Sequence, residues 1–221
     1  SAGSGKRFGG SLPKQYTLID GIPVIIRTLH AFQDIEAVTA FVIPINPEWE
    51  SYLSKLLEEY NIIKPVLFTP GGRERQDSVC RAIEAANTLK PGIILVHDAV
   101  RPFVSKELVL SVIDNAGRYG AAIPALPARD TIKRKDNNGF VIETLNRSEL
   151  IAVQTPQGFR TDLLIKAYDI ASQKNIYSTD DAALAEMAGI PIKIVAGEDT
   201  NIKITTPTDT VTALAILGAR P

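Results

Sequence analysis

The chain has a single cysteine, Cys80, and only two histidines among its 221 residues. One cysteine excludes a disulfide framework and a cysteine-rich zinc site, and it fits a reducing compartment, so we expect a cytoplasmic protein. No apolar run approaches the roughly 20 residues that a membrane span needs, and no signal peptide is recognisable. The net charge of -1 provides no general attraction for nucleic acid. Any phosphate chemistry therefore has to come from local clusters of basic residues.

Short, continuous apolar runs alternate with helical patterns along the chain. The runs that we predict as strands cover residues 40–45, 66–68, 93–96, 121–125 and 192–195. The segments that we predict as helices cover residues 24–32, 48–60, 74–86, 106–117, 162–174, a run after Thr179 that stops at Gly189, and 207–218. Strands that are apolar throughout are typical of a parallel sheet covered on both faces. The order predicts one Rossmann-like, doubly wound α/β domain over residues 1–221, with a mostly parallel sheet.

Residues 130–145 break this alternation. They are typical of two strands around the turn Asn138-Gly139, which is a β-hairpin signal. Because the segment is polar on both sides, it does not fit the core, and we predict a protruding arm over residues 128–150. An arm without a core of its own needs a surface to pack on. A second copy of the chain is the simplest candidate, so we expect a homodimer.

The first motif with chemical content is a glycine-rich basic loop, Gly3-x-Gly5-Lys6-Arg7, followed shortly by Lys14. Its glycines let backbone N–H groups approach a triphosphate, and its cations can neutralise the charge. The spacing matches neither the Walker A motif nor the dinucleotide fingerprint. Since such loops normally follow a buried strand, we expect a strand ahead of it. The alternative interpretation is a solvated basic terminus.

A second motif lies where the apolar run 93–96 ends, in His97-Asp98-Ala99-Val100-Arg101. Open α/β sheets bind ligands beyond the carboxyl ends of their strands. We therefore predict that Asp98 holds Mg²⁺, which takes one or two carboxylates plus phosphate oxygens, and that Arg101 takes a substrate phosphate. Alternatively, Asp98 caps the turn and Arg101 pairs with it on the surface. We expect His97 to be a packed strand residue rather than a ligand.

Two further motifs are candidates for binding anions. The turn Gly71-Gly72 before the helix at 74–86 is typical of a loop that accepts an anion or a base, although an ordinary β-to-α turn looks the same. Lys203 lies between Ile202 and Ile204 on a predicted short strand. A lysine in apolar surroundings favours an anionic partner such as phosphate. The alternative is that its stem packs while its head reaches water.

In their order and spacing, these motifs resemble those of the methylerythritol-phosphate cytidylyltransferase family of non-mevalonate isoprenoid synthesis. The resemblance runs from Ser1 to about Leu217. It rests on residues 2–7, 13–16, 71–72, 74–75, 78–79, 96–99, 101–102, 129–134, 155–157, 179–182 and 201–205.

The resemblance implies a homodimer in which the arm of one subunit completes the active site of the other, with CTP and methylerythritol phosphate as substrates and Mg²⁺ as cofactor. The implied catalytic residues are Arg7, Lys14, Arg147 and Lys203. The implied nucleotide-binding residues are Ala2, Gly3, Ser4, Gly5, Lys6, Gly71, Gly72, Ser78 and Ala99. The implied acceptor-binding residues are Asp98, Arg101, Thr131, Thr155 and Thr179, of which Asp98 also holds the metal. Thr131 would reach the site on the arm of the other subunit, together with Arg147.

The charges also suggest a mechanism. The acceptor phosphate is already an anion at neutral pH, so its attack on the α-phosphorus of CTP needs no general base. The protein has to position the two substrates and neutralise the charge of their phosphates. Two alternatives remain open. A ribitol-5-phosphate cytidylyltransferase would share the scaffold, but residues 130–134 and 144–147 favour methylerythritol phosphate. A catalytically silent nucleotide-binding subunit is the other, and Arg7, Lys14, Asp98 and Lys203 together argue against it.

Overall fold

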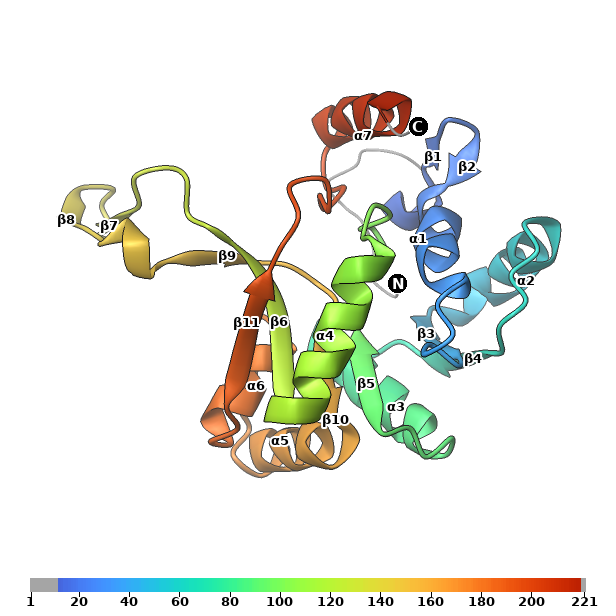
Figure 1. Cartoon of the computed structure of the whole chain (residues 1–221), viewed down its shortest axis with the longest axis horizontal. Helices are drawn as coiled ribbons and strands as arrows, with labels where there is room; N and C mark the ends of the chain where they lie inside the picture. The colour runs from blue at the N-terminus through green and yellow to red at the C-terminus, as the bar shows by residue number, and fades with distance from the viewer. Residues whose placement is uncertain (1–11, 220–221) are drawn as a thin grey trace.

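The computed structural model describes residues 12–219, in which strands and helices alternate as the sequence predicted (Figure 1). The helices are α1 (Val24–Gln33), α2 (Glu50–Glu59), α3 (Arg75–Asn87), α4 (Lys106–Tyr119), α5 (Thr161–Gln173), α6 (Asp181–Met187) and α7 (Pro207–Ala219). The strands are β1 (Leu18–Ile19), β2 (Ile22–Pro23), β3 (Phe41–Ile45), β4 (Val66–Pro70), β5 (Ile93–Val96), β6 (Ala121–Pro127), β7 (Lys133–Lys135), β8 (Val141–Thr144), β9 (Ile151–Val153), β10 (Gln157–Arg160) and β11 (Ile192–Ala196). Short 3-10 turns cover Lys14–Tyr16 (η1), Pro47–Trp49 (η2) and Arg147–Glu149 (η3).

The central sheet has the strand order β11-β6-β10-β5, and β9 pairs with β6. Strands β11 and β6 are parallel, with Ile194 opposite Ile123, whereas β10 is antiparallel to both β5 and β6. Strands β11, β6 and β5 therefore share one direction, and the α/β fold class is confirmed. Strands β3 and β4 form a separate parallel pair, in which Phe41 lies opposite Val66.

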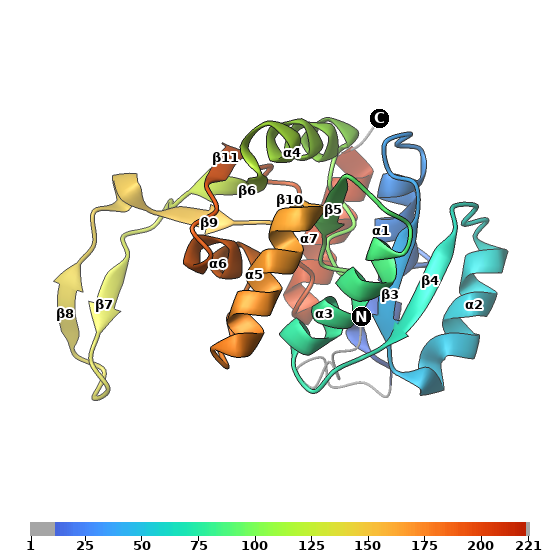
Figure 2. The ribbon, with the colours of Figure 1, turned by 90° about the horizontal axis from the view of Figure 1, so that it is seen from below.

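Helices cover both faces of the central sheet (Figure 2). The neighbouring residues Ala121 and Ala122 of β6 belong to different buried clusters, because successive side chains of a strand point to opposite faces. One cluster joins the sheet to α5 and α6, and the other joins it to α4. The approach of α4 is close, since a Cβ at Gly158 of β10 would lie 2.6 Å from Val112 Cγ1.

The structure differs from the predicted secondary structure at residues 47–49, around Lys203 and at β10, and it adds the unpredicted strands β1, β2 and β9. Residues 47–49 form a 3-10 turn ahead of α2 rather than its first turn. The segment around Lys203 is not a strand, although Ile204 N donates a hydrogen bond to Val100 O at 2.9 Å. Strand β10 was not predicted, because the sequence Gln-Gly-Phe-Arg contains only one large apolar residue.

The predicted hairpin is confirmed, and it projects from the rest of the molecule (Figure 1). Strands β7 and β8 pair antiparallel, and Gly139 has a φ of 90° at the turn, a value that suits glycine. Every residue of both strands is exposed. Three neighbouring apolar residues, Phe140, Val141 and Ile142, are also exposed, and Phe140 reaches 73%. Within residues 12–219, no helix is long and apolar enough to cross a bilayer.

Candidate active site

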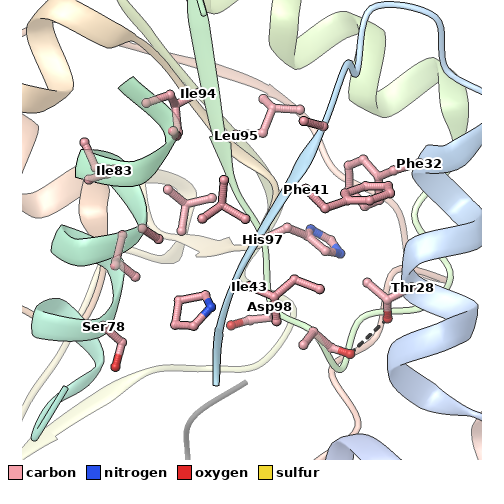
Figure 3. Close-up of a pocket in the computed structure, with 18 of the residues that line it drawn as sticks. Thr28, Phe32, Phe41, Ile43, Ser78, Ile83, Ile94, Leu95, His97 and Asp98 are labelled. Carbon is pink, nitrogen blue, oxygen red and sulfur yellow. Dashed lines mark hydrogen bonds between the residues drawn. The ribbon is translucent and has the colours of Figure 1, made fainter. Parts of the chain in front are cut away.

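A cavity of about 920 Å³ opens at the carboxyl end of β5 (Figure 3). Its lining includes Lys14, Gly72, Ser78, Asp98 and Lys203, which come from four separate predicted motif segments. Figure 3 shows Ser78 and Asp98 at one end of the cavity and Ile94 and Leu95 at the other. The polar end suits a phosphate-bearing ligand, whereas the apolar end between β3 and β5 does not.

Asp98 is the electrostatic centre of the polar end. Its Oδ2 lies 3.0 Å from Lys203 Nζ and 3.1 Å from Arg101 Nε. Burial alone would raise the pKa of Asp98, but the charges of Lys203 and Arg101 outweigh that effect and hold its pKa below the ordinary value. The predicted pairing of Arg101 with Asp98 is thus present. It is not a surface pair, because the two side chains are only 12% and 16% exposed.

A hydrogen-bonded chain beneath Asp98 fixes the strand end. Asp98 N donates to Thr155 Oγ1 at 3.0 Å, and the hydroxyl in turn lies 3.1 Å from His97 Nδ1. His97 Nε2 lies 3.0 Å from Arg101 O, a group that only accepts. His97 therefore carries its proton on Nε2, and Thr155 donates to Nδ1. Burial is the main cause that lowers the pKa of His97 to about 4, so the ring is neutral at pH 7.

This geometry gives Thr155 and His97 supporting positions. Thr155 is only 7% exposed, and its hydroxyl is engaged below Asp98. His97 packs on Phe32, with the ring centroids 4.8 Å apart, in line with the prediction that it is packed. The sequence did not indicate that these two side chains would hold the backbone of Asp98.

The sequence also missed Asn201, which was part of a motif but received no role. Asn201 is fully buried, and its Nδ2 donates to Thr155 O at 2.9 Å. The main-chain carbonyl oxygen of Asn201 accepts a hydrogen bond from Arg101 Nη1 at 2.8 Å. Asn201 thereby joins the segment of Lys203 to the strand end that carries Asp98. The only signal in the sequence is its position two residues before Lys203.

The Gly71-Gly72 turn is held by α3. Gly72 N donates to Ser78 Oγ at 2.8 Å, and Arg81 Nη1 donates to Gly71 O at 2.7 Å. Only glycine fits at position 72, since a Cβ there would lie 2.2 Å from Asp77 Cβ. The turn is consequently a preformed loop that ends at the polar end of the cavity.

The remaining predicted residues fall into three groups. Ala99 lies on the cavity wall, and its carbonyl oxygen accepts from Thr28 Oγ1 at 3.0 Å. Thr179 is exposed just ahead of α6. Thr131 and Arg147 lie on the arm, which projects away from the cavity of its own chain (Figure 1), and Arg147 Nη1 donates to Arg129 O at 2.7 Å. The predicted residues Ala2, Gly3, Ser4, Gly5, Lys6 and Arg7 lie outside the described residues.

The described residues offer limited means to hold a metal. Between residues 12 and 219, no group of three or more His, Cys, Asp or Glu side chains comes together. Asp98 alone fits a Mg²⁺ ion that takes its other ligands from substrate phosphates and water, which is the usual arrangement for this ion. Its Oδ2 is already shared by Lys203 and Arg101, so the ion would have to compete with these cations or use the other oxygen.

Known proteins of one family match the chain over almost its whole length. The sequence pattern of the family described as 2-C-methyl-D-erythritol 4-phosphate cytidylyltransferase (IspD) matches residues 1–219. A Bacillus cereus protein of that name is 43% identical over 217 residues, 98% of this chain and 95% of the relative. One from Geobacillus kaustophilus is 44% identical over 220 residues, 100% of this chain and 95% of the relative. The crystal structure of the Thermus thermophilus enzyme has a TM-score of 0.80 at 37% identity, covering 94% of this chain and 95% of that one. The resemblance of the motifs is therefore confirmed, and the chain belongs to the 2-C-methyl-D-erythritol 4-phosphate cytidylyltransferase family.

Proposed function

We propose that this chain transfers the cytidylyl group of CTP to 2-C-methyl-D-erythritol 4-phosphate, giving CDP-methylerythritol and pyrophosphate in isoprenoid synthesis. The observation that carries the proposal is that Lys14, Asp98, Lys203 and Gly72 all line one cavity, in a member of this family. Phosphoryl transfer depends mainly on positioning and charge neutralisation, and this set of residues supplies both.

The nucleotide would lie along the polar end of the cavity. Gly71, Gly72, Ser78 and Ala99 would bind its base and ribose, which is supported by the preformed Gly71-Gly72 turn and by the positions of Gly72, Ser78 and Ala99 in the cavity lining. The basic loop at residues 2–7 and Lys14 would neutralise the triphosphate. Such preorganised charges stabilise a transition state effectively, since they need no rearrangement during the reaction.

In the reaction, a phosphate oxygen of the acceptor attacks the α-phosphorus of CTP in line. The bond from that phosphorus to the bridging oxygen breaks, and its electron pair leaves with pyrophosphate. Lys203 would neutralise charge at the α-phosphate, which is supported by its position in the cavity lining beside Asp98. Mg²⁺, when bound by Asp98 and substrate phosphates, supplies further positive charge to the leaving group.

No side chain has to remove a proton from the acceptor. The nucleophile is anionic at neutral pH, and the histidine of the site, His97, is buried and engaged at both ring nitrogens. This agrees with a site whose reactive side chains are cations and a single carboxylate rather than a nucleophile and a base.

The acceptor would bind beside Asp98, to Arg101 and Thr179, with Thr155 as the support below. Thr131 and Arg147 would come from the arm of a second subunit, residues 128–150, because the arm of the same chain points away (Figure 1). The exposed apolar residues at the tip of this arm support a homodimer, since a partner surface would remove them from water. We also propose a cytoplasmic location, supported by the single, unpaired cysteine.

The proposed function is tested by pyrophosphate release from the full chain with CTP and Mg²⁺ and with each of two acceptors. Methylerythritol phosphate should give the higher kcat/KM. A higher kcat/KM with ribitol 5-phosphate would show that the proposed acceptor is wrong and that the proposed cytidylyl transfer is right. Binding of CTP without pyrophosphate release from either acceptor would contradict the enzymatic function itself.

A further inference from the structure

The first turn of α3 is joined to the segment that carries Thr179 by side chains of consecutive residues. Gln76 Nε2 donates to Ile176 O at 2.9 Å, and Gln76 Oε1 accepts from Ser178 N at 2.9 Å. The nitrogen and the oxygen of one side-chain amide therefore hydrogen-bond to the backbone on either side of Tyr177. Arg75 and Gln76 lie three and four residues after Gly72. Their contacts with residues 176–181, which we call the seam, therefore lie between the proposed nucleotide loop and a proposed acceptor residue.

The second part of the seam is an ion pair between Arg75, whose side chain is 39% exposed, and a buried carboxylate. Arg75 reaches Asp181 with two hydrogen bonds, from Nη2 to Oδ2 at 2.6 Å and from Nη1 to Oδ1 at 3.2 Å. Asp181 is the first residue of α6 and is 1% exposed. Tyr168 of α5 donates its hydroxyl to the same carboxylate at 2.6 Å. A two-point contact between a guanidinium and a carboxylate fixes orientation as well as distance. Figure 2 shows α3, α5 and α6, the three helices that carry these residues, on one side of the sheet.

The two sides of the seam depend on it to different degrees. The Gly72 turn has supports of its own, because Ser78, Arg81 and the capping box of α3 hold it. In contrast, residues 176–178 bond across to α3 through the two hydrogen bonds of Gln76 and one longer bond, from the exposed Tyr177 hydroxyl to Asp77 Oδ1 at 3.3 Å. Losing the seam should therefore displace the segment of Thr179 and leave the turn in place.

We infer that Gln76 and Arg75 are positioning residues, which set the acceptor-binding segment at Thr179 relative to the nucleotide loop. The inference rests on the proposed function, in which Thr179 contacts the acceptor. Neither side chain has to touch a substrate for this role. The consequence is a specific kinetic signature, a raised KM for the acceptor with a nearly unchanged KM for CTP.

The test compares single variants of the full chain by steady-state pyrophosphate release. Gln76→Leu keeps the size of the side chain and removes both hydrogen bonds. It should raise the KM for methylerythritol phosphate about tenfold and leave the KM for CTP within about twofold. Arg75→Met should shift the same constant in the same direction, and if burying Asp181 without its partner prevents folding, Gln76→Leu alone decides.

Arg81→Met is the matched control, since it removes an α3 side chain that supports only the Gly72 turn. Arg81→Met should raise the KM for CTP and leave the KM for the acceptor unchanged. Amide exchange at Ser178 should also become faster in Gln76→Leu. An unchanged acceptor KM or an unchanged exchange rate in Gln76→Leu would overturn the inference.

Thr179→Val separates this inference from the function on which it rests. If Thr179→Val raises the acceptor KM and Gln76→Leu does not, only the positioning role is wrong. If Thr179→Val leaves the acceptor KM unchanged, the assignment of Thr179 is wrong and the positioning role falls with it.

Discussion

Lys203 Nζ lies 3.0 Å from Asp98 Oδ2, and this ion pair joins two segments that are far apart in the sequence. The carboxylate is 16% exposed and the lysine 42%, so Lys203 is partly open to water while it lines the cavity. Both earlier interpretations of this lysine thus apply in part. The pair places a cation beside the carboxylate that we propose as the Mg²⁺ ligand.

Asp98→Asn should lower kcat by on the order of 100-fold, because the amide neither binds Mg²⁺ as well nor holds Lys203 in place. The half-saturating Mg²⁺ concentration for pyrophosphate release should also rise. Asp114→Asn is the control, as Asp114 forms an ion pair with Arg118 on the exposed surface of α4. If Asp98→Asn had the same turnover and the same Mg²⁺ dependence as the unmodified protein, the assignment of Asp98 as the metal ligand would be wrong.

Acid should destabilise the fold through His97. Burial lowers its pKa to about 4 from an ordinary value of 6.5. Between these two pH values the unfolded chain binds more protons than the folded one, so the free energy of unfolding falls as the pH drops from 6.5 toward 4. Above pH 6.5 the contribution is complete, and it is on the order of 3 kcal/mol at most.

Urea unfolding at several pH values between 7 and 5 measures this effect of His97. His97→Gln should remove most of the pH dependence in this range. His30→Gln provides the comparison, because it deletes the other histidine of the chain and should keep the dependence. The same slope in His97→Gln and in the unmodified protein would show that another group is responsible.

Lys14→Ala should fold normally and turn over on the order of 100-fold more slowly or worse, since it removes a charge from the proposed transition-state cradle. Pyrophosphate release and thermal unfolding, measured on the same preparation, separate the two effects. Lys106→Ala removes an exposed lysine at the start of α4 and should change neither. A near-normal kcat in Lys14→Ala would show that the lysine is not catalytic.

The sequence predicted the elements whose signal is local. Continuous apolar runs marked β3, β5 and β6, and Asp98, two residues after β5, marked the end of the sheet where the cavity lies. Turn chemistry marked the hairpin, since Asn138-Gly139 provides the backbone conformation that the turn requires.

What could not be predicted depends on contacts between distant segments. Strand β10 is mostly polar and small, and it is a strand because β5 and β6 flank it. Thr155 appears in the sequence as one polar residue in a turn. Its place under Asp98 follows from a hydrogen bond across 57 positions, which no local pattern encodes. The seam between α3 and residues 176–181 was missed for the same reason.

The arm provides the sharpest test of the quaternary arrangement. If the arm of one subunit completes the site of the other, Lys14→Ala and Arg147→Ala damage the same site from different chains. In a mixed dimer, one site then carries both defects and the other carries neither. Random mixing of the two inactive variants should therefore restore about a quarter of the normal activity. If the arm instead served its own chain, every site would remain defective and no activity would return.

The apolar tip of the arm should hold this dimer together. Phe140→Ser combined with Ile142→Ser removes two exposed apolar side chains, of which Phe140 is 73% exposed, and should shift the mass in light scattering from dimer to monomer. The monomer should bind CTP and lose turnover, because the nucleotide residues lie in the body of each chain. Ile63→Ser is the matched control, since Ile63 is 79% exposed on the loop after α2 and lies away from the arm (Figure 1). It should remain dimeric and active, and a fully active monomer of the double variant would refute the role of the arm.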